Sequence, residues 1–249
     1  MELTDLLKNR RTVRKYSAKK IEKSLLNELL TATIRTANTG NMQPYSIVVT
    51  TDEELKKQLS PCHFNQPSIT SAPVVLTFCA DFNRIEKWCR QRNAEAGFRN
   101  FQSFFTASID ALLASQTFCL LAESKGLGTC YFGTTTYTSE QIINILQLPE
   151  SVVPVITVTV GYPDGTPAQV DRLPLEAVVH IDKYKDYSPA DINRIYAEKE
   201  SLPENKKFVE ENSKETLAQV FTDIRYTKKN NEAFSGTFLE AIKKQGFLE

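Results

Sequence analysis

The clearest candidate for a functional site in the sequence is a group of three arginines within five residues near the start of the chain. Such a group could bind an anion. Arg10, Arg11 and Arg14 surround the hydroxyl of Thr12 in the segment RRTVRKYS. A phosphate group held there would gain about 1.5–3 kcal/mol from each charge-assisted hydrogen bond. The alternative is three solvated cations at the C-terminal end of a short helix. Spacing alone favours this alternative, because cations at helix ends are common.

A polar loop further along the chain is a second candidate for ligand binding. It carries the side chains of Asn38, Thr39 and Gln43. Gly40 permits a close approach of the backbone, and Pro44 is expected to hold Gln43 in an extended conformation. Such a loop could line a planar ligand that has many hydrogen-bond acceptors. An ordinary connection between a helix and a strand is the favoured alternative, since turn chemistry explains the same residue types.

Two other places are weaker candidates when each is taken singly. One is Gln66. The other is a segment that follows a short predicted strand and consists of Tyr131, Phe132, Gly133 and Thr134. Because an aromatic pair at the end of a strand usually belongs to the core, this segment alone does not indicate a site.

The sequence shows no arrangement typical of a protein nucleophile, a general base or a metal site. His63 and His180 are the two histidines, with neither a Ser/His/Asp order nor metal-ligand spacing around them, so we predict no metal and no catalytic side chain. Asp110 is the only carboxylate inside a strongly apolar stretch, and we expect it to find a structural hydrogen-bond partner. Any enzyme chemistry is then expected from an organic cofactor.

The composition argues against nucleic acid and membrane surfaces as partners. The 249 residues are 41% hydrophobic, enough for a proper core, and 30 basic residues balance 30 acidic ones. The first residues, MELTDLLKNRR, lack the apolar region of a secretory signal. No stretch is expected to approach the roughly 18 apolar residues of a membrane span. These features predict a cytoplasmic protein.

The five cysteines form an odd set without CxxC spacing. Three of them lie in apolar surroundings, where a free thiol behaves as a small hydrophobic side chain. We therefore expect buried free thiols.

Hydrophobic periodicity predicts a mixed α and β domain over the first 160 residues. The expected helices are 3–9, 21–37 and 104–122, and the expected strands are 46–50, 74–80 and 152–160. The nine glycines form no GxGxxG motif after a strand, which argues against a Rossmann fold, and no Walker A motif is present.

The stretch 104–122 is apolar on almost every side, which a helix in a monomer of this size can rarely satisfy. We therefore expect it either at the centre of the core or at an oligomer interface. Residues 183–229 are rich in charge and predict exposed helices and loops. Periodicity returns over 238–247, so the tail is expected to dock on the domain.

Several segments, taken in order, resemble one known family. They are RRTVRKY, TGNMQPYS, FNQ before SAPVVLTFCADFNR, AESKGLGTCYFG, VGYPDGTP with DRLP, and KKQGF near the end. Over about residues 3–247 they are similar to the oxygen-insensitive nitroreductase and flavin reductase family, in its branch with a C-terminal excursion. The resemblance implies a nitroreductase-like α+β fold, with a mixed sheet flanked by helices, in a homodimer of domain-swapped type. Residues 1–182 would form the FMN-binding domain, and 183–249 a helical excursion packed on it.

The resemblance also implies where FMN would bind, at the dimer interface. Its phosphate and ribityl chain would be held by Arg10, Arg11, Thr12, Arg14 and Arg172. The isoalloxazine ring would be lined by Gln66, Tyr131, Phe132, Gly133 and Thr134. The partner subunit would contribute its own Asn38, Thr39, Gly40 and Gln43.

The activity implied by the resemblance is reduction by NADH or NADPH through bound FMN. The nicotinamide would transfer a hydride and leave, and a small-molecule acceptor would then bind on the same flavin face, in a ping-pong sequence. The acceptor would be a nitroaromatic, a quinone or a free flavin. Two alternatives stay open, a different flavin chemistry within the superfamily and a flavin-binding protein without turnover.

The sequence departs from the family pattern at two places. Val170 stands two positions before the arginine of DRLP, where the branch usually has a basic residue, so one phosphate contact is missing or replaced. The loop that holds the extra phosphate of NADPH in relatives would fall near 213–216, where Lys214 is the only basic residue, and Thr136 replaces a common arginine. The choice between NADH and NADPH therefore does not follow from the resemblance.

Overall fold

The structure, a computed structural model, describes residues 2–248, which form two compact units. The first unit contains the chain up to residue 168 together with residues 234–248, and the second contains residues 169–233. The chain thus divides after 168, whereas the expected domain boundary lies after 182. The assignment of 183–249 as an excursion packed on the first domain stays a prediction.

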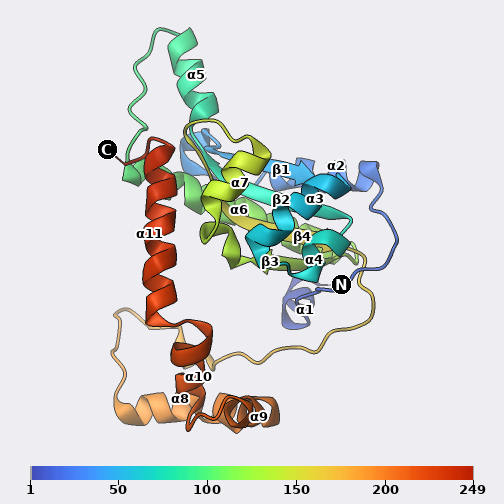
Figure 1. The fold of residues 1–249 in the computed structure, drawn as a ribbon, viewed down its shortest axis with the longest axis vertical. Coiled ribbons are helices and arrows are strands. Elements are labelled where there is room, and N and C mark those ends of the chain that lie inside the picture. The colour runs from blue at the N-terminus through green and yellow to red at the C-terminus, as the bar shows by residue number, and fades with distance from the viewer. Residues whose placement is uncertain (1, 249) are drawn as a thin grey trace. The chain divides into compact units, whose positions relative to one another are not determined.

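A four-stranded sheet is the framework of the first unit (Figure 1). Its strands are β1 (Tyr45–Thr50), β2 (Val74–Asp81), β3 (Gly128–Phe132) and β4 (Val152–Gly161), in the order β1-β2-β4-β3. All three pairings are antiparallel, so the α+β class is confirmed but the expectation of a mixed sheet is wrong for these strands. An apolar run in the sequence predicts a buried strand but not the direction of its neighbour, which the connections decide.

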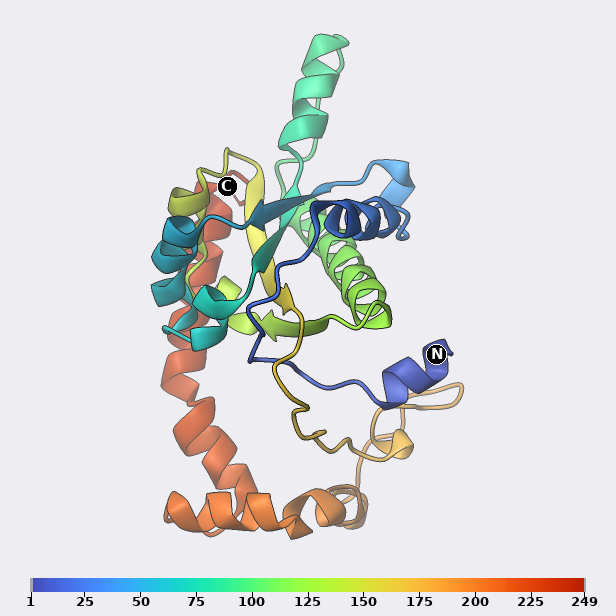
Figure 2. The same ribbon diagram turned by 90° about the vertical axis from the view of Figure 1, so that its right-hand side faces the viewer.

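Helices α2 (Lys23–Thr33) and α6 (Phe101–Ser124) cover one face of the sheet (Figure 2). The main core lies between them and the strands, and it contains fully buried side chains such as Leu29, Phe78 and Phe118. Burying a side chain of this size stabilises the fold by about 1.5–3 kcal/mol. Both helices agree with the periodicity of the sequence, α2 being shorter and α6 longer than expected.

Helix α6 has two different faces. On its inner face, Ala107, Ala111 and Ala114 are completely buried and let the helix lie close to the sheet. Its outer face is apolar but open, with side chains that are 43–51% exposed: Phe101, Phe105, Ile109, Leu112 and Leu113. The helix is therefore a core element by one face, and its other face is available to a second chain.

The expectation that no stretch approaches a membrane span is wrong for α6. Among the described residues it is the one helix that is long and apolar enough to cross a membrane, by length and composition alone. The core helix of a folded domain passes the same test, and α6 packs its inner face on β2 and β4. The expected cytoplasmic location stays a prediction.

Helices α3 (Glu53–Leu59), α4 (Pro67–Ser71) and α7 (Ser139–Leu146) cover the opposite face of the sheet (Figure 2). Successive residues of a strand point to opposite faces. Strand β3 accordingly sends Tyr131 toward the main core and Phe132 into a second core. The second core consists of Leu59, Cys62, Ile69, Cys130, Phe132 and Ile142.

Shorter elements complete the first unit. They are α1 (Leu3–Lys8), α5 (Asn83–Gln91) and the 3-10 helices Thr39–Asn41, Ser60–His63 and Gly133–Thr136. Helix α5 extends away from the sheet in both views (Figures 1 and 2). After helix α11 (Lys228–Lys244), Phe247 is completely buried in the main core, as is Ile242 near the end of that helix. The predicted docking of the tail is confirmed.

The second unit is helical and largely exposed, as its charge-rich composition predicts. Its elements are α8 (Pro189–Ser201), α9 (Pro203–Glu211), α10 (Leu217–Val220), a 3-10 helix (Leu175–Ala177) and a π-helix (Phe221–Arg225). Its buried apolar side chains include Ile195, Leu217 and Val220.

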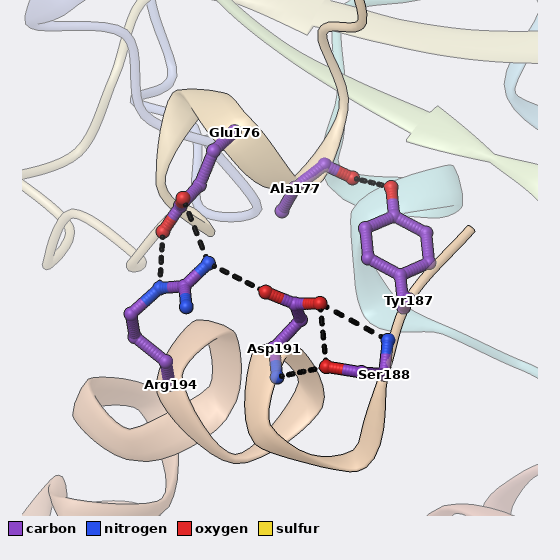
Figure 3. A network of polar contacts seen from close by, with 6 residues as sticks. All are labelled: Glu176, Ala177, Tyr187, Ser188, Asp191 and Arg194. Atoms are coloured by element: carbon purple, nitrogen blue, oxygen red, sulfur yellow. Dashed lines mark hydrogen bonds and ion pairs between the residues drawn. The ribbon is translucent and has the colours of Figure 1, made fainter. Parts of the chain in front are cut away.

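A polar network joins the irregular start of the second unit to α8 (Figure 3). The Arg194 guanidinium binds the Glu176 carboxylate in a bidentate manner, through two hydrogen bonds of 3.0 Å each. It donates a third hydrogen bond of 3.0 Å to Asp191. Ser188 caps α8 by accepting from the backbone N–H of Asp191, whose carboxylate accepts from the Ser188 N–H. Because these contacts tie Glu176 to α8, the compact unit begins before the expected boundary at 182.

The cysteines are free thiols, and Cys62, Cys79, Cys119 and Cys130 are buried while Cys89 is half-buried. Burial raises the pKa of Cys119 to about 11, and it also raises the pKa of Cys79. Thiols with such pKa values stay protonated near neutral pH. The prediction of buried thiols is confirmed for these four residues.

His63 is buried between the second core and the turn that follows β3. Its side chain is completely buried, and its ring meets Phe132 edge-on with centroids 5.2 Å apart. Its Nδ1 lies 2.9 Å from the hydroxyl oxygen of Thr134, whereas Nε2 has no hydrogen-bond partner among residues 2–248. Burial lowers the pKa of His63 to about 4, so the imidazole is neutral near pH 7.

We predict that His63 makes the fold sensitive to pH between its ordinary pKa of 6.5 and its folded pKa of about 4. As the pH falls through this window, the unfolded chain binds a proton that the folded chain does not, so the free energy of unfolding decreases. The full effect is about 3.5 kcal/mol, since one pKa unit corresponds to about 1.4 kcal/mol. Urea unfolding at several pH values measures it.

Carboxylates also titrate in this pH range, in the wild type and in any variant. Two variants separate the contribution of His63 from theirs. His63→Phe and His63→Gln both replace the ring with a side chain that does not titrate. Both should lose less stability than the wild type on acidification, whatever their packing costs at neutral pH. Parallel stability curves for wild type and both variants would contradict the prediction.

Candidate functional site

The basic turn at residues 10–14 lies directly on strand β3. The backbone N–H of Val13 donates to the carbonyl oxygen of Thr129 at 3.0 Å. A Cβ added at Gly128 would lie 2.4–2.7 Å from three carbon atoms of the Val13 side chain. Only a glycine at 128 therefore lets the turn approach the strand this closely.

Arg10 is paired with a carboxylate that the strand also holds. Its Nε lies 3.3 Å from Oε1 of Glu123 in α6, and the Thr129 hydroxyl donates to the same oxygen at 2.5 Å. Burial raises the pKa of Glu123, and the Thr129 hydrogen bond and the Arg10 charge oppose that rise. The pair orients the guanidinium of Arg10 while using only one of its five N–H donors.

Arg11 carries the feature of the turn that points most directly to a ligand. Its Nε is buried and has no hydrogen-bond partner among the described residues. An unsatisfied buried donor costs about 1–3 kcal/mol, so such an atom normally has a partner when a site is complete. Arg10 and Arg11 line a cavity of about 210 Å³. At about 30 Å³ for each water molecule, this volume is sufficient for a phosphate group.

The other two residues of the turn differ in exposure. Thr12 is half-buried, and Arg14 is exposed. Burial raises the pKa of Cys130 in β3, and the charge of Arg14 opposes that rise, so Arg14 also lies beside the strand. The predicted cationic cluster thus runs along one strand, and its residues fit a phosphate.

The opposite end of β3 carries the predicted ring-binding segment. Tyr131 and Phe132 are the last two residues of the strand, and Gly133 and Thr134 begin the 3-10 helix that follows. Phe132 is buried in the second core, so only its backbone can face a ligand. The hydroxyl of Tyr131 donates to Gln116 of α6 at 3.1 Å, and burial raises the pKa of Tyr131.

Gln66 is brought to this end of the strand through His63. Gln66 is half-buried at the start of α4, and its backbone N–H donates to the carbonyl oxygen of His63 at 3.2 Å. The His63 ring contacts Thr134, and the Thr138 hydroxyl donates to the carbonyl oxygen of Cys62 at 2.8 Å. These bonds connect the segment before Gln66 with the segment after β3.

The polar loop is fixed to α6 by Asp110. The backbone N–H and the hydroxyl of Thr39 donate to the two carboxylate oxygens at 2.8 and 3.2 Å. Asp110 is 2% exposed, so the prediction that it finds a structural partner is confirmed. Asn38 supports the loop from within, because its side-chain oxygen accepts from the Gln43 N–H at 3.2 Å.

The backbone of this loop is left-handed at three positions. The φ angles are +55° at Gly40, +55° at Asn41 and +52° at Gln43. The expectation that Pro44 holds Gln43 extended is wrong. Tertiary hydrogen bonds outweigh the local preference, since Arg84 donates to the Gln43 carbonyl and Asn38 accepts from its N–H.

Arg172 belongs to the second unit, whereas the turn at 10–14 belongs to the first. It is exposed, and its Nη1 donates to the carbonyl oxygens of Val170 and Asp171 at 3.4 and 2.8 Å. Within that unit it lines a cavity of about 650 Å³ with Tyr196 and Phe221 among others. Its predicted phosphate contact stays a prediction.

Sequence reasoning missed two residues that organise this region, Glu123 and His63. Glu123 ends an apolar helical stretch, and a carboxylate there needs a cation once it is buried. His63 stands three residues before Gln66, but nothing in its neighbourhood signals that it is buried. Within residues 2–248, no group of three or more His, Cys, Asp or Glu side chains is placed to hold a metal ion.

Two relatives match the chain along almost its full length. The FMN reductase [NAD(P)H] of Bacillus subtilis (strain 168) is 30% identical over 250 residues, which cover 99% of this chain and 98% of the relative. The oxygen-insensitive NADPH nitroreductase of Salmonella typhimurium (strain LT2) is 29% identical over 245 residues, which cover 98% and 97%.

A family model and a crystal structure agree with these relatives. The model of the Nitroreductase family matches residues 7–162, more than half of the chain. The crystal structure of a protein from Bacteroides fragilis NCTC 9343 is 59% identical, covers 98% of this chain and 100% of its own, and has a TM-score of 0.97. The nitroreductase-like fold is thereby confirmed. The match from the basic turn to the end of β4, together with identity along the whole chain, shows that this protein belongs to the nitroreductase family.

Proposed function

We propose that this protein is an FMN-dependent oxidoreductase that uses NADH or NADPH to reduce a small-molecule acceptor, a nitroaromatic, quinone or free flavin. Its full-length relatives are an FMN reductase and an NADPH nitroreductase. The observation that carries the proposal is Arg11, whose Nε is buried without a hydrogen-bond partner among residues 2–248 and whose side chain lines a cavity beside the strand. A phosphate monoester is the ligand that such a site fits.

The residues of the first unit proposed to hold FMN form two groups, one beside the start of β3 and one at its end. The phosphate and ribityl chain would be held by Arg10, Arg11, Thr12 and Arg14, with Arg172 added from the second unit. The ring would lie along Gln66, Tyr131, Phe132, Gly133 and Thr134. When bound, FMN supplies hydride chemistry, with the nicotinamide and the acceptor using the same site in turn, a ping-pong sequence.

In this scheme the polypeptide binds and orients FMN, and we assign no side chain to acid or base catalysis. The Arg10–Glu123 pair fixes one guanidinium, which leaves its outer N–H groups for the phosphate. His63 stays neutral and so adds no charge beside Thr134. Phe132 anchors the ring-binding segment in the second core.

A homodimer completes the proposed site. The open face of α6 presents a row of apolar side chains at helical spacing, from Phe101 to Leu113. Contiguous exposed apolar surface of this kind marks interaction sites, and a second copy of α6 would cover it. The partner subunit's Asn38, Thr39, Gly40 and Gln43 would then reach the flavin ring.

We predict that the purified protein binds FMN and that its yellow colour bleaches without oxygen when NADH or NADPH is added. The rates of bleaching and of the return of colour with menadione or a nitroaromatic measure the two half-reactions. Comparing the rates of bleaching by NADH and by NADPH shows which nicotinamide the protein prefers as reductant. A protein that keeps its colour with both nicotinamides would be a flavin-binding protein without turnover, and our proposal would then fail.

We predict that Arg11→Ala weakens FMN binding by roughly 10- to 150-fold, the loss expected for one charge-assisted hydrogen bond. Fluorescence titration of the apoprotein with FMN measures the Kd. Lys15→Ala is the matched control, because it removes the same charge from an exposed position four residues away. Arg11 is a sharper test than Arg10, whose loss would leave Glu123 buried without its cation. An unchanged Kd would show that Arg11 does not hold the FMN phosphate.

We predict that Ile109→Asp with Leu113→Asp on the open face of α6 converts the dimer to monomer and lowers FMN affinity. The charges would have to be buried at the interface, at a cost that exceeds the apolar contact they replace. Light scattering measures the mass. Gln58→Asp on α3, also an exposed helical position, is the control and should stay dimeric. A wild-type protein that is monomeric with FMN bound would contradict the dimer.

A further inference from the structure

The cavity beside the basic turn is lined by a residue with an unused acceptor, as well as by Arg11 with its unused donor. Oε2 of Glu123 is buried and has no hydrogen-bond partner among residues 2–248. The Glu123 side chain is 9% exposed, and it lines the same cavity of about 210 Å³ as Arg10 and Arg11. Buried polar atoms are normally paired once a site is complete. Two lining residues thus keep one donor and one acceptor for a ligand.

The other oxygen of the Glu123 carboxylate is already engaged. Oε1 accepts from the Thr129 hydroxyl at 2.5 Å and lies 3.3 Å from Nε of Arg10. One contact comes from β3 and the other from the basic turn, so the carboxylate is held from two sides. An ionised carboxylate accepts hydrogen bonds but cannot donate them. The partner that suits Oε2 is therefore a group that brings a proton.

The charges that line this cavity favour a ligand with a single negative charge. The charged residues of its lining are Arg10, Arg11 and Glu123, two cations and one anion, which sum to +1. Arg14 is exposed and lies outside the lining. The Cys119 thiol, which also interacts with Glu123, stays neutral because burial raises its pKa to about 11. A phosphate dianion would meet the carboxylate as a like charge, whereas a monoanion matches the sum.

The surroundings of Glu123 also favour a proton on the carboxylate. Burial raises its pKa, and the Thr129 hydrogen bond and the Arg10 charge oppose that rise. A phosphate monoester has a second pKa of about 6. Near neutral pH, a carboxylate and a phosphate side by side therefore bind one proton between them more readily than either does in water.

We infer that Glu123 selects the singly protonated form of the FMN phosphate, with one proton shared between a phosphate oxygen and Oε2 of Glu123. The inference rests on the proposed function, which supplies FMN as the ligand, and it gives Glu123 a role beyond orienting Arg10. Above about pH 6 free FMN is a dianion, so it takes up one proton when it binds. Because the bound state holds the extra proton, FMN affinity falls as the pH rises.

The test is the Kd of FMN for the apoprotein between pH 6.5 and 8.5, measured by fluorescence titration. The Kd of the wild type should rise roughly 50- to 100-fold over this range. Calorimetry at pH 8 in two buffers of different ionisation enthalpy should show the uptake of about one proton for each FMN bound. Riboflavin, which is FMN without its phosphate, should show neither effect.

Glu123→Gln separates this role from a structural one. The amide keeps an oxygen for Thr129 and Arg10, and it offers an N–H donor in place of Oε2, so it pairs with the dianion directly. Its Kd should change by less than about threefold over the same pH range and should be lower than that of the wild type at pH 8.5. A purely structural role predicts weaker binding at every pH. Glu22→Gln removes the same charge from an exposed position and should follow the wild type.

Three results would overturn the inference. The first is a wild-type Kd that is constant between pH 6.5 and 8.5, and the second is binding of FMN without proton uptake. The third is an equal rise of the Kd in wild type and Glu123→Gln, which would assign the pH dependence to another group. The proposed function survives all three, because FMN still binds. If FMN binds at no pH, the proposed function fails and the inference fails with it.

Discussion

Helix α6 packs on the sheet through small alanine side chains, and the position of the candidate site depends on this contact. The close approach places polar side chains of the same helix beside three separate segments. Asp110 binds the polar loop, Ser115 lies 3.4 Å from the hydroxyl of Tyr131 at the end of β3, and Glu123 binds the basic turn. One rigid helix thus sets the spacing of segments that are far apart in the chain, as a preorganised site requires.

Buried polar groups make this arrangement specific. Both carboxylate oxygens of Asp110 accept from Thr39, so any other position of the loop would leave a buried charge unpaired. Arg10 and Glu123 compensate each other in the same way at the opposite end of the helix. Arg11 differs, because its buried Nε lacks a partner among the described residues, as do four other buried side-chain atoms, among them Oε2 of Glu123 and Nε2 of His63. Within the basic turn, Arg11 thus retains an N–H donor that has no protein partner among residues 2–248.

On the face of the sheet away from α6, one contact connects two segments of the candidate site, and one short turn has strained backbone angles. His63, buried and neutral, connects the segment before Gln66 to Thr134. The same short helix ends in the left-handed pair Phe64 and Asn65, which directs an aromatic ring toward solvent. A buried histidine and an exposed phenylalanine side by side are both unfavourable for the fold alone. Their combination next to the proposed flavin ring is understandable if the segment serves binding.

The sequence by itself determined the helices α1, α2 and α6, the strands β1, β2 and β4, the structural role of Asp110, the buried thiols and the family, because periodicity and motif order are local properties. Tertiary structure alone decided that the sheet is antiparallel, that Gln43 is left-handed, that Arg10 pairs with Glu123 and that His63 is buried. These features depend on contacts between residues distant in the chain, up to 113 positions apart for Arg10 and Glu123, which no local pattern encodes. Spacing alone favours three solvated cations, and only the position of the turn beside β3, with the cavity that Arg10 and Arg11 line, makes the arginines a candidate site for a phosphate.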